Sequence, residues 1–205
     1  MGAPTKETAA ENAATDNSET NKGTDMVTLK TIKSNKTLKR TTVHRIALGD
    51  ITPNNLGQLK KLNTVLFPVQ YSEKFYKDVL EVGEFARFAY FNDCCVGAVC
   101  CRKEPLKEVN QGIPSDQAKL YIMTLGVLAP YRNLGIGTKL LEHILQHATL
   151  PTQQPKFVEI YLHVQTSNEE ALNFYKKYDF EIVATVEGYY KKISPSDAYV
   201  LSRKL

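Results

Sequence analysis

The amino-acid sequence predicts a mixed α/β fold, in which one sheet carries helices on both faces. The apolar run over residues 120–128 is typical of a buried strand, and residues 138–148 then place apolar side chains at helical spacing. Residues 157–164 alternate between two faces, as a strand does, and a second helical pattern follows over 168–178. This strand–helix–strand–helix order follows shorter strands and helices, so we expect a mixed sheet that is covered on both sides.

Before residue 104 the elements follow from turn residues and apolar spacing. Thr52 and Pro53 have the residue types that cap and begin a helix, and Pro68 cannot continue it because proline lacks the N–H group. Asn92 and Asp93 are typical turn residues between two strand patterns. The expected elements are a strand over 43–48, a helix from 53 that ends before 67, a helix over 74–82, and a hairpin of strands 85–90 and 94–102.

After residue 104 the order is a loop, two strand–helix pairs and a final hairpin. Pro105, Gly112 and Pro114 predict a flexible loop over 104–117. Ser167 or Asn168 is the expected cap of the helix over 168–178. The remaining expected elements are a hairpin of 180–186 with 189–193 through Glu187 and Gly188, and a short last strand over 199–201.

The 205 residues accommodate one domain and a tail. Residues 1–41 are polar, then basic, without apolar periodicity, so we predict a disordered tail followed by a domain over 42–205. The basic run is interpreted as a solvated linker, with contact to RNA, a ribosome or an acidic partner, or a nuclear targeting signal, as the alternatives. Its cations are Lys30, Lys33, Lys36, Lys39, Arg40 and Arg45.

Composition excludes several classes of protein. No apolar run is long enough to span a bilayer and no signal-peptide core is present, so we expect no membrane association. The net charge of +4 gives no reason to expect a specific nucleic-acid partner. Two adjacent cysteine pairs lie in an apolar strand pattern, where neighbours point to opposite faces, so we predict reduced core cysteines and no metal site. Such cysteines suit the cytoplasm, and the nucleus as a second location.

The segment Arg132–Gly137 has the pattern R-x-x-G-x-G between the strand and the helix. The first N–H groups of a helix lack internal partners, and the helix dipole adds positive potential, so a helix start binds anions. Glycines let a phosphate approach the backbone closely. The alternative is an ordinary glycine-rich turn from strand to helix.

This segment resembles the pyrophosphate loop of GNAT acetyltransferases. The resemblance implies the GNAT fold, with helices on both faces of a splayed, mostly antiparallel sheet, and acetyl-CoA as the acetyl donor. A second motif, N-x-x-A-x-x-F-Y-x-x-x-D-F from Asn168, resembles another GNAT motif that usually has Gly where this chain has Asp179. Asp tolerates a positive φ better than most residues. The residues implied in binding coenzyme A are Leu125, Val127, Arg132, Asn133, Leu134, Gly135, Ile136, Gly137, Thr138, Asn168 and Tyr175.

Residues 45–205 more specifically resemble the NatE branch of the N-terminal α-acetyltransferases, through segments 67–71, 74–84, 121–126, 161–164 and 189–193. The resemblance implies that Tyr121 and His163 hold a water that takes the proton from the attacking amine, and that the Tyr175 hydroxyl lies near the thioester sulfur. An α-amino group has a pKa of about 7.7–8.0, so a base within reach directly or through one water suffices. No acyl-enzyme is expected, because the amine attacks directly.

The same resemblance implies an apolar, aromatic site for a protein N-terminus, preferring an initiator Met followed by a hydrophobic residue. Its residues would be Phe67, Pro68, Val69, Tyr71, Met123, Tyr189, Tyr190 and Ile193. It also implies the NatA catalytic and auxiliary subunits at the ribosome as partners. The alternatives are a GNAT enzyme that acetylates protein lysines and a largely non-catalytic subunit of an N-terminal acetyltransferase complex.

Overall fold

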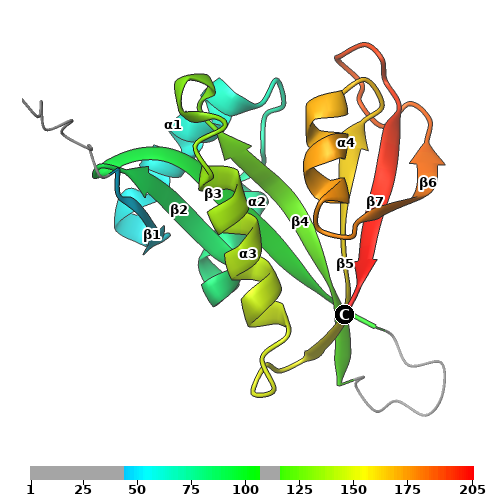
Figure 1. The fold of residues 1–205 in the computed structure, drawn as a ribbon, viewed down its shortest axis with the longest axis horizontal. Coiled ribbons are helices and arrows are strands. Elements are labelled where there is room, and N and C mark those ends of the chain that lie inside the picture. The colour runs from blue at the N-terminus through cyan, green and yellow to red at the C-terminus, as the bar shows by residue number, and fades with distance from the viewer. Residues whose placement is uncertain (1–43, 107–115) are drawn as a thin grey trace, which may run out of the picture. The chain divides into compact units, whose positions relative to one another are not determined.

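The computed structural model describes residues 44–106 and 116–205 (Figure 1). The described residues belong to the unit Thr42–Leu205. The predicted tail over 1–41 and the centre of the predicted loop, residues 107–115, lie outside the described residues.

One seven-stranded sheet forms the centre of this unit, in the order β1-β2-β3-β4-β5-β7-β6. Only β4 and β5 pair in parallel, and all other neighbours are antiparallel, as expected for a mostly antiparallel mixed sheet. The strands are β1 Ile46–Asp50, β2 Ala86–Phe91, β3 Cys94–Pro105, β4 Gln117–Val127, β5 Lys156–Gln165, β6 Glu181–Val186 and β7 Ala198–Lys204.

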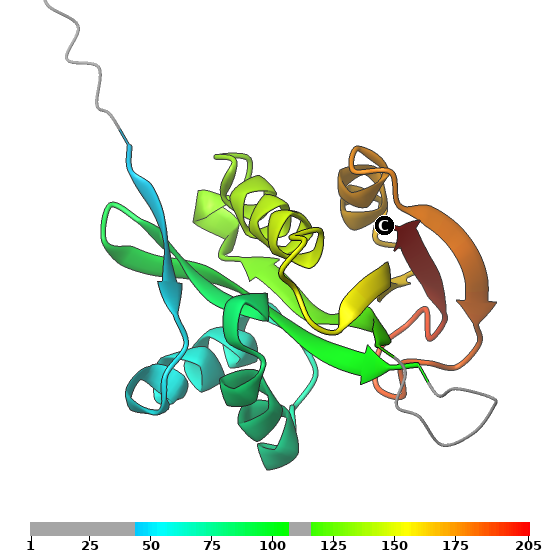
Figure 2. The ribbon, with the colours of Figure 1, turned by 90° about the horizontal axis from the view of Figure 1, so that it is seen from below.

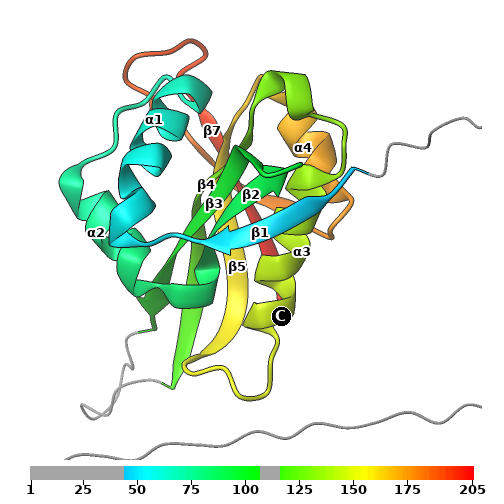
Figure 3. The same ribbon diagram turned by 90° about the vertical axis from the view of Figure 1, so that its left-hand side faces the viewer.

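Helices cover both faces of the sheet, which confirms the sequence prediction (Figures 2 and 3). On one face lie α1 (Leu56–Leu66) and α2 (Glu73–Glu81), and on the other α3 (Ile136–Ala148) and α4 (Glu169–Lys176). Three short 3₁₀ helices, η1 Pro53–Asn55, η2 Gly83–Phe85 and η3 Ala129–Tyr131, precede α1, β2 and α3. No described helix is long and apolar enough to span a bilayer.

Local chemistry explains where the helices begin and end. The Asn55 side chain accepts a hydrogen bond from the Thr52 N–H group at 2.8 Å, which fixes the turn before α1. The helix ends at Leu66, two residues before Pro68, as predicted. The Asn168 side chain caps α4 by accepting from the Ala171 N–H group at 3.1 Å.

The core lies between the sheet and both helix layers. Phe85 packs edge-on against Phe157 at 5.1 Å between ring centroids, beside large apolar side chains from β2, β4, β5 and α3. Cys100 and Cys101 are buried there as predicted. The prediction was wrong for Cys94, which is exposed because it begins β3 at the hairpin turn.

The sheet opens between β4 and β5. Their parallel pairing runs from Gln117 with Lys156 to Tyr121 with Tyr161 and stops there, although both strands continue. Figure 1 shows the two strands separating toward their C-terminal ends. Cys100 pairs with Thr124 and Cys101 with Ile122, so Met123 is the extra residue of a bulge in β4. A bulge bends its strand and changes which face later residues occupy.

Two predicted elements differ in the structure. Residues 189–193 form no strand, and β6 pairs instead with β7, which extends over seven residues. The reason is that β7 buries Ala198 and Leu201 and hydrogen-bonds β5 on its other side, so it occupies the centre of this part of the sheet. The predicted loop is also shorter than 104–117, because β3 continues to Pro105 and β4 begins at Gln117.

Candidate active site

The N-terminus of α3 has the geometry of an anion site. Gly135 precedes the helix with φ of +80°, and Asn133 has φ of +60°. No side chain among the described residues caps the first turn, so the N–H groups there remain available to an anion. A Cβ atom built on Gly135 would have no described neighbour within 4 Å. The loop therefore fits a diphosphate, the group that coenzyme A presents.

The side chains around this loop do not all face a ligand. Ile136 is buried in the core, so its predicted contact with coenzyme A falls to its backbone. The Arg132 guanidinium donates to the Val127 carbonyl oxygen at 3.2 Å and lies 3.6 Å from Glu170, so it braces the loop against β4 and α4. Leu134 is exposed and Thr138 half-buried, where a cofactor can reach both.

The α4 helix supplies the other residues of the second motif. Asn168 uses its side-chain oxygen to cap α4, so a contact with coenzyme A falls to its amide nitrogen. Tyr175 is buried between Phe174 and Phe180. Burial raises the pKa of its hydroxyl, and the nearby Cys101 thiol adds to this shift. The hydroxyl therefore keeps its proton at neutral pH and can donate a hydrogen bond to a leaving thiolate. Asp179 has φ of +60°, as predicted.

The predicted pair, Tyr121 and His163, meets where β4 and β5 separate. The Tyr121 hydroxyl lies 3.2 Å from His163 Nδ1, so the two side chains share one face of the sheet. We expected room for a bridging water between them, but this distance is a direct hydrogen bond. A water would have to bind beside the pair. Tyr189 completes the group, since its hydroxyl lies 3.1 Å from that of Tyr121 and its ring stacks on His163 at 4.4 Å.

The pKa shifts assign different states to these groups. Burial lowers the pKa of His163 below its usual value, and Glu104 opposes this only in part. Burial and the hydrogen bond with Tyr189 raise the pKa of Tyr121. At neutral pH the imidazole is thus neutral and able to accept a proton, whereas the phenol stays protonated. His163 is the base of the pair.

A polar group on the same face was not predicted from the sequence. The Tyr161 hydroxyl donates to Glu104, which also pairs with Arg102. The guanidinium of Arg102 lies over the Tyr121 ring at 5.2 Å, and Tyr161 stacks on Tyr121 at 4.9 Å. Burial alone would raise the pKa of Glu104, but the hydrogen bonds from Tyr161 and Arg102 outweigh it and lower the pKa. The alternation of residues 157–164 places Tyr161 on the same strand face as His163, so this pattern could have identified Tyr161. Glu104 could not be identified in this way, because it fell in the predicted loop over 104–117.

An aromatic wall adjoins this face. A Cβ atom on Gly126 of β4 would come within 2.9 Å of the Phe67 ring, so Phe67 lies directly on this strand. Tyr71 lies edge-on to Phe67 at 6.1 Å between centroids. Burial raises the pKa of Tyr71, and the neighbouring Tyr190 is the next largest cause of this rise. The loop after β6, which carries Tyr190, therefore lies near the loop after α1, which carries Tyr71. The structure thus joins two predicted substrate-binding segments that are far apart in sequence.

The remaining predicted residues lie around these groups. Met123, Leu125 and Val127 are half-buried on β4 and pack against the core. Pro68 and Val69 are exposed beside Phe67, and Ile193 is half-buried in the loop between β6 and β7. Their positions allow the predicted roles, which stay predictions.

Comparison with known proteins agrees with this geometry. The model of the Acetyltransferase (GNAT) family matches residues 56–180. The chain belongs to the GNAT acetyltransferase family. Among curated GNAT relatives, N-alpha-acetyltransferase 50 of Danio rerio is 57% identical over 161 residues, which cover 78% of this chain and 89% of that protein. The probable N-acetyltransferase san of Drosophila melanogaster is 56% identical over 160 residues, with 78% and 81% covered.

A solved GNAT structure is similar as well. Naa50 of Arabidopsis thaliana, in complex with the bisubstrate analogue CoA-Ac-MVNAL, superposes with a TM-score of 0.70 at 50% identity. The match covers 78% of this chain and 99% of that one. In that protein, coenzyme A, an acetyl group and a peptide that begins with Met and Val are joined in one ligand.

Proposed function

We propose that this GNAT chain is an N-terminal α-acetyltransferase, which transfers the acetyl group of acetyl-CoA to the α-amino group of protein chains. The observation that carries the proposal is the hydrogen-bonded pair of Tyr121 and His163 at the opening between β4 and β5. The uncapped start of α3 follows β4, so a donor held there directs its thioester toward this opening. Relatives at 56–57% identity named as N-acetyltransferases support the same activity.

In the proposed reaction the amine nitrogen attacks the thioester carbonyl carbon, and the carbon–sulfur bond breaks. The amine proton passes to neutral His163, directly or through a water beside the pair, because the lowered pKa of His163 leaves the imidazole unprotonated. Tyr121 orients this imidazole through the hydrogen bond at Nδ1. Tyr175 stays protonated because burial raises its pKa, and it donates a hydrogen bond to the departing thiolate, which leaves as the coenzyme A anion.

For the substrate we propose protein N-termini with an initiator Met followed by a hydrophobic residue. Phe67, Tyr71 and Tyr190 form an apolar aromatic wall against β4, which suits a Met side chain and its apolar neighbour. The peptide in the solved relative begins with Met and Val. The loop that carries Tyr189 and Tyr190 lies across the site, which favours a chain terminus over a lysine within a chain.

The deciding experiment is acetylation of a peptide panel by the full chain with acetyl-CoA. We expect Met-Leu and Met-Val N-termini to react faster than Ser or Ala N-termini, and faster than the same peptides with a blocked N-terminus and an internal lysine. Faster reaction of the blocked lysine peptides would favour the lysine acetyltransferase. An absence of turnover with intact coenzyme A binding would favour the non-catalytic subunit.

The cellular setting is part of the proposal. The NatA catalytic and auxiliary subunits at the ribosome are the proposed partners, and the cytoplasm, with the nucleus, is the proposed location. Buried, unpaired cysteines such as Cys100 and Cys101 suit a reducing compartment. Co-purification of the tagged chain with the two NatA subunits is the measurement that tests the partnership.

A further inference from the structure

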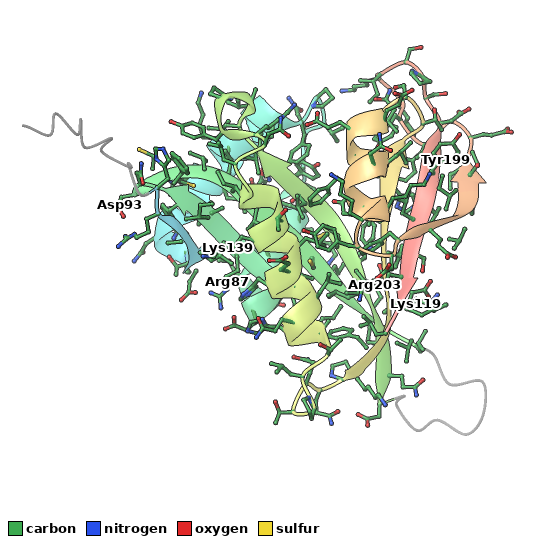
Figure 4. All side chains as sticks on the ribbon, viewed as in Figure 1. Arg87, Asp93, Lys119, Lys139, Tyr199 and Arg203 are labelled. Atoms are coloured by element: carbon green, nitrogen blue, oxygen red, sulfur yellow. The ribbon has the colours of Figure 1, made fainter. Side chains whose placement is uncertain are left out.

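Three potential metal ligands meet far from the proposed reaction. Glu84 lies in η2, and His143 and His147 lie one turn apart on α3, with one ligand atom from each within 4.8 Å of the others. Arg87, which pairs with Glu84, marks their position beside α3 in Figure 4. His147 is ten residues beyond Gly137, which is about 15 Å along the helix. The cluster is therefore separate from the anion site at the start of α3.

The spacing of the ligand atoms matches a tetrahedral metal ion. Nε2 of His143 and Nε2 of His147 lie 3.4 Å and 3.5 Å from the same carboxylate oxygen of Glu84. Zinc–nitrogen and zinc–oxygen bonds of about 2.0–2.2 Å place tetrahedral ligands roughly 3.3–3.5 Å apart. Two histidines four residues apart on a helix present their rings on one side, and here the ring centroids are 4.0 Å apart.

A hydrogen bond also orients one of the two imidazoles for metal binding. Nδ1 of His147 donates to the His143 carbonyl oxygen at 2.8 Å, which leaves Nε2 as the ring nitrogen that faces Glu84. Nε2 of His143 lies 3.0 Å from the Glu84 carbonyl oxygen, and a metal ion would replace this contact.

Arg87 is the competing cation. It pairs with both Glu84 and Asp50, and its Nε lies 3.4 Å from His143 Nε2. Because Asp50 can retain the guanidinium, Glu84 can turn toward an ion without leaving Arg87 unpaired. A cleft of about 270 Å³ is lined in part by Asp50, Glu84 and Arg87, so of the three proposed ligands it reaches Glu84. The arrangement predicts a site of modest affinity that is selective for ions preferring nitrogen ligands.

We propose that Glu84, His143 and His147 bind a divalent transition-metal ion of the Zn²⁺ type, with water as the fourth ligand. The ion joins η2, which leads into β2, to the C-terminal half of α3. It stabilises the packing of α3 on the sheet and takes no part in acetyl transfer. The predictions that the cysteines hold no metal and that acetyl transfer needs none are unaffected, and the proposal does not depend on the proposed function.

Calorimetric titration of the full chain with Zn²⁺ alone tests the site. We expect one saturable site in a background with Cys94→Ser and Cys95→Ser, and a melting temperature raised by about 5–10 °C at a hundredfold excess over Kd. His147→Gln should weaken the affinity at least tenfold and remove the thermal shift. His44→Gln, which changes an exposed histidine elsewhere, should leave both unchanged, and Mg²⁺ should not bind.

The proposal would be overturned by a lack of saturable binding, by unchanged affinity in His147→Gln, or by loss of binding with the two cysteine substitutions alone, which would assign the ion to those thiols. Glu84→Gln provides a second variant, since it keeps the side-chain shape. Its affinity should fall at least tenfold, and wild-type affinity in this variant would also contradict the site.

Discussion

At the scale of single residues, the site depends on one imidazole whose neighbours keep it neutral and oriented. Tyr121 bonds to Nδ1 of His163, and Tyr189 both stacks on the imidazole and bonds to Tyr121. Glu104, held by Arg102 and Tyr161, is the acidic group that raises the pKa of His163 against the effect of burial. The balance leaves a base whose pKa lies below the usual histidine value.

Removing either member of the pair should slow turnover strongly. His163→Ala and Tyr121→Phe should each lower kcat by about 10²–10⁴-fold, which is the usual effect of positioned proton transfer, with little change in coenzyme A affinity. The two losses should not add, because Tyr121 acts through His163. Steady-state kinetics of both single variants and the double variant measure this. Tyr199→Phe, a substitution on β7 (Figure 4), is the control. If the two losses in kcat added independently in the double variant, the two residues would not share one step.

The pH dependence should report the same imidazole. His163 has a lowered pKa, so it is neutral at pH 7 and becomes protonated only below about pH 6.5, where activity should fall. The activity should rise a second time as the substrate α-amino group loses its proton, near its pKa of about 7.7–8.0. The profile of kcat/KM from pH 5 to 9 measures both steps. His163→Gln should lose the acidic step and keep the amine step; an unchanged acidic step would assign it to another group.

At the scale of elements, each proposed binding site lies at the end of a secondary-structure element. The N-terminus of α3 is the proposed diphosphate site, and the N-terminus of α4 follows β5 as α3 follows β4. Both helix starts therefore lie toward the end at which the two strands separate (Figure 1). The loops after α1 and β6 supply the aromatic wall.

A larger residue at the start of α3 should block the donor. Gly137→Val should weaken coenzyme A binding about 100-fold, because losing two charge-assisted hydrogen bonds costs about 3 kcal/mol or more. A Cβ atom there would lie 3.7 Å from Phe174, an ordinary contact, so the fold should persist. Calorimetric titration with coenzyme A measures the affinity. Gly57→Val in α1 is the matched control. Equal coenzyme A affinity in the two variants would refute the proposal that the turn at the start of α3 binds the diphosphate.

The aromatic wall should affect the peptide more than the donor. Phe67→Ala and Tyr190→Ala should each lower kcat/KM for a Met-Leu peptide by about tenfold to a few hundredfold, the range expected for filling an apolar pocket. Coenzyme A affinity should stay near wild type. Competition between Met-Leu and Ser- or Ala-starting peptides gives the selectivity. Val65→Ala, at an exposed position in α1 two residues before Phe67, is the control. A wild-type preference for Ser- or Ala-starting peptides would refute the predicted specificity for Met followed by a hydrophobic residue.

At the scale of the whole molecule, the folded unit over Thr42–Leu205 contains the complete proposed site. Its sheet connects the donor site, the base and the aromatic wall, since all three rest on β4 or on segments that pack against it. The tail contributes charge, with a basic run and no apolar periodicity in its sequence.

Deleting residues 1–40 should therefore leave catalysis intact. The melting temperature and the turnover of a Met-Leu peptide should stay nearly unchanged, because the tail has no apolar face to join a core. Ribosome co-sedimentation at rising salt measures its remaining role, which should show a steep salt dependence if the basic run makes contact. A large fall in melting temperature would instead show that the tail packs on the domain.

The local sequence was sufficient for the helices, the mixed sheet and the anion loop. Periodicity, Pro68 and the glycines of the α3 turn act through neighbouring residues, so their effects can be predicted without tertiary contacts. The pairing of β6 could not be predicted this way, because β7 competes with residues 189–193 for the same strand edge. The resemblance to a known family supplied Tyr121 and His163, whose residue types alone indicated little.

Only the tertiary structure decided how these groups meet. The hydrogen bond between Tyr121 and His163 joins residues 42 apart in the sequence, and the contact of Tyr121 with Tyr189 joins residues 68 apart. The first depends on the register of β4 with β5 and on the point where their pairing ends, and the second depends on the loop between β6 and β7, which carries Tyr189. Glu84 and His143, 59 residues apart, meet because α3 packs beside η2. Sequence patterns determine which elements form, whereas distances between distant side chains follow from strand register and helix packing.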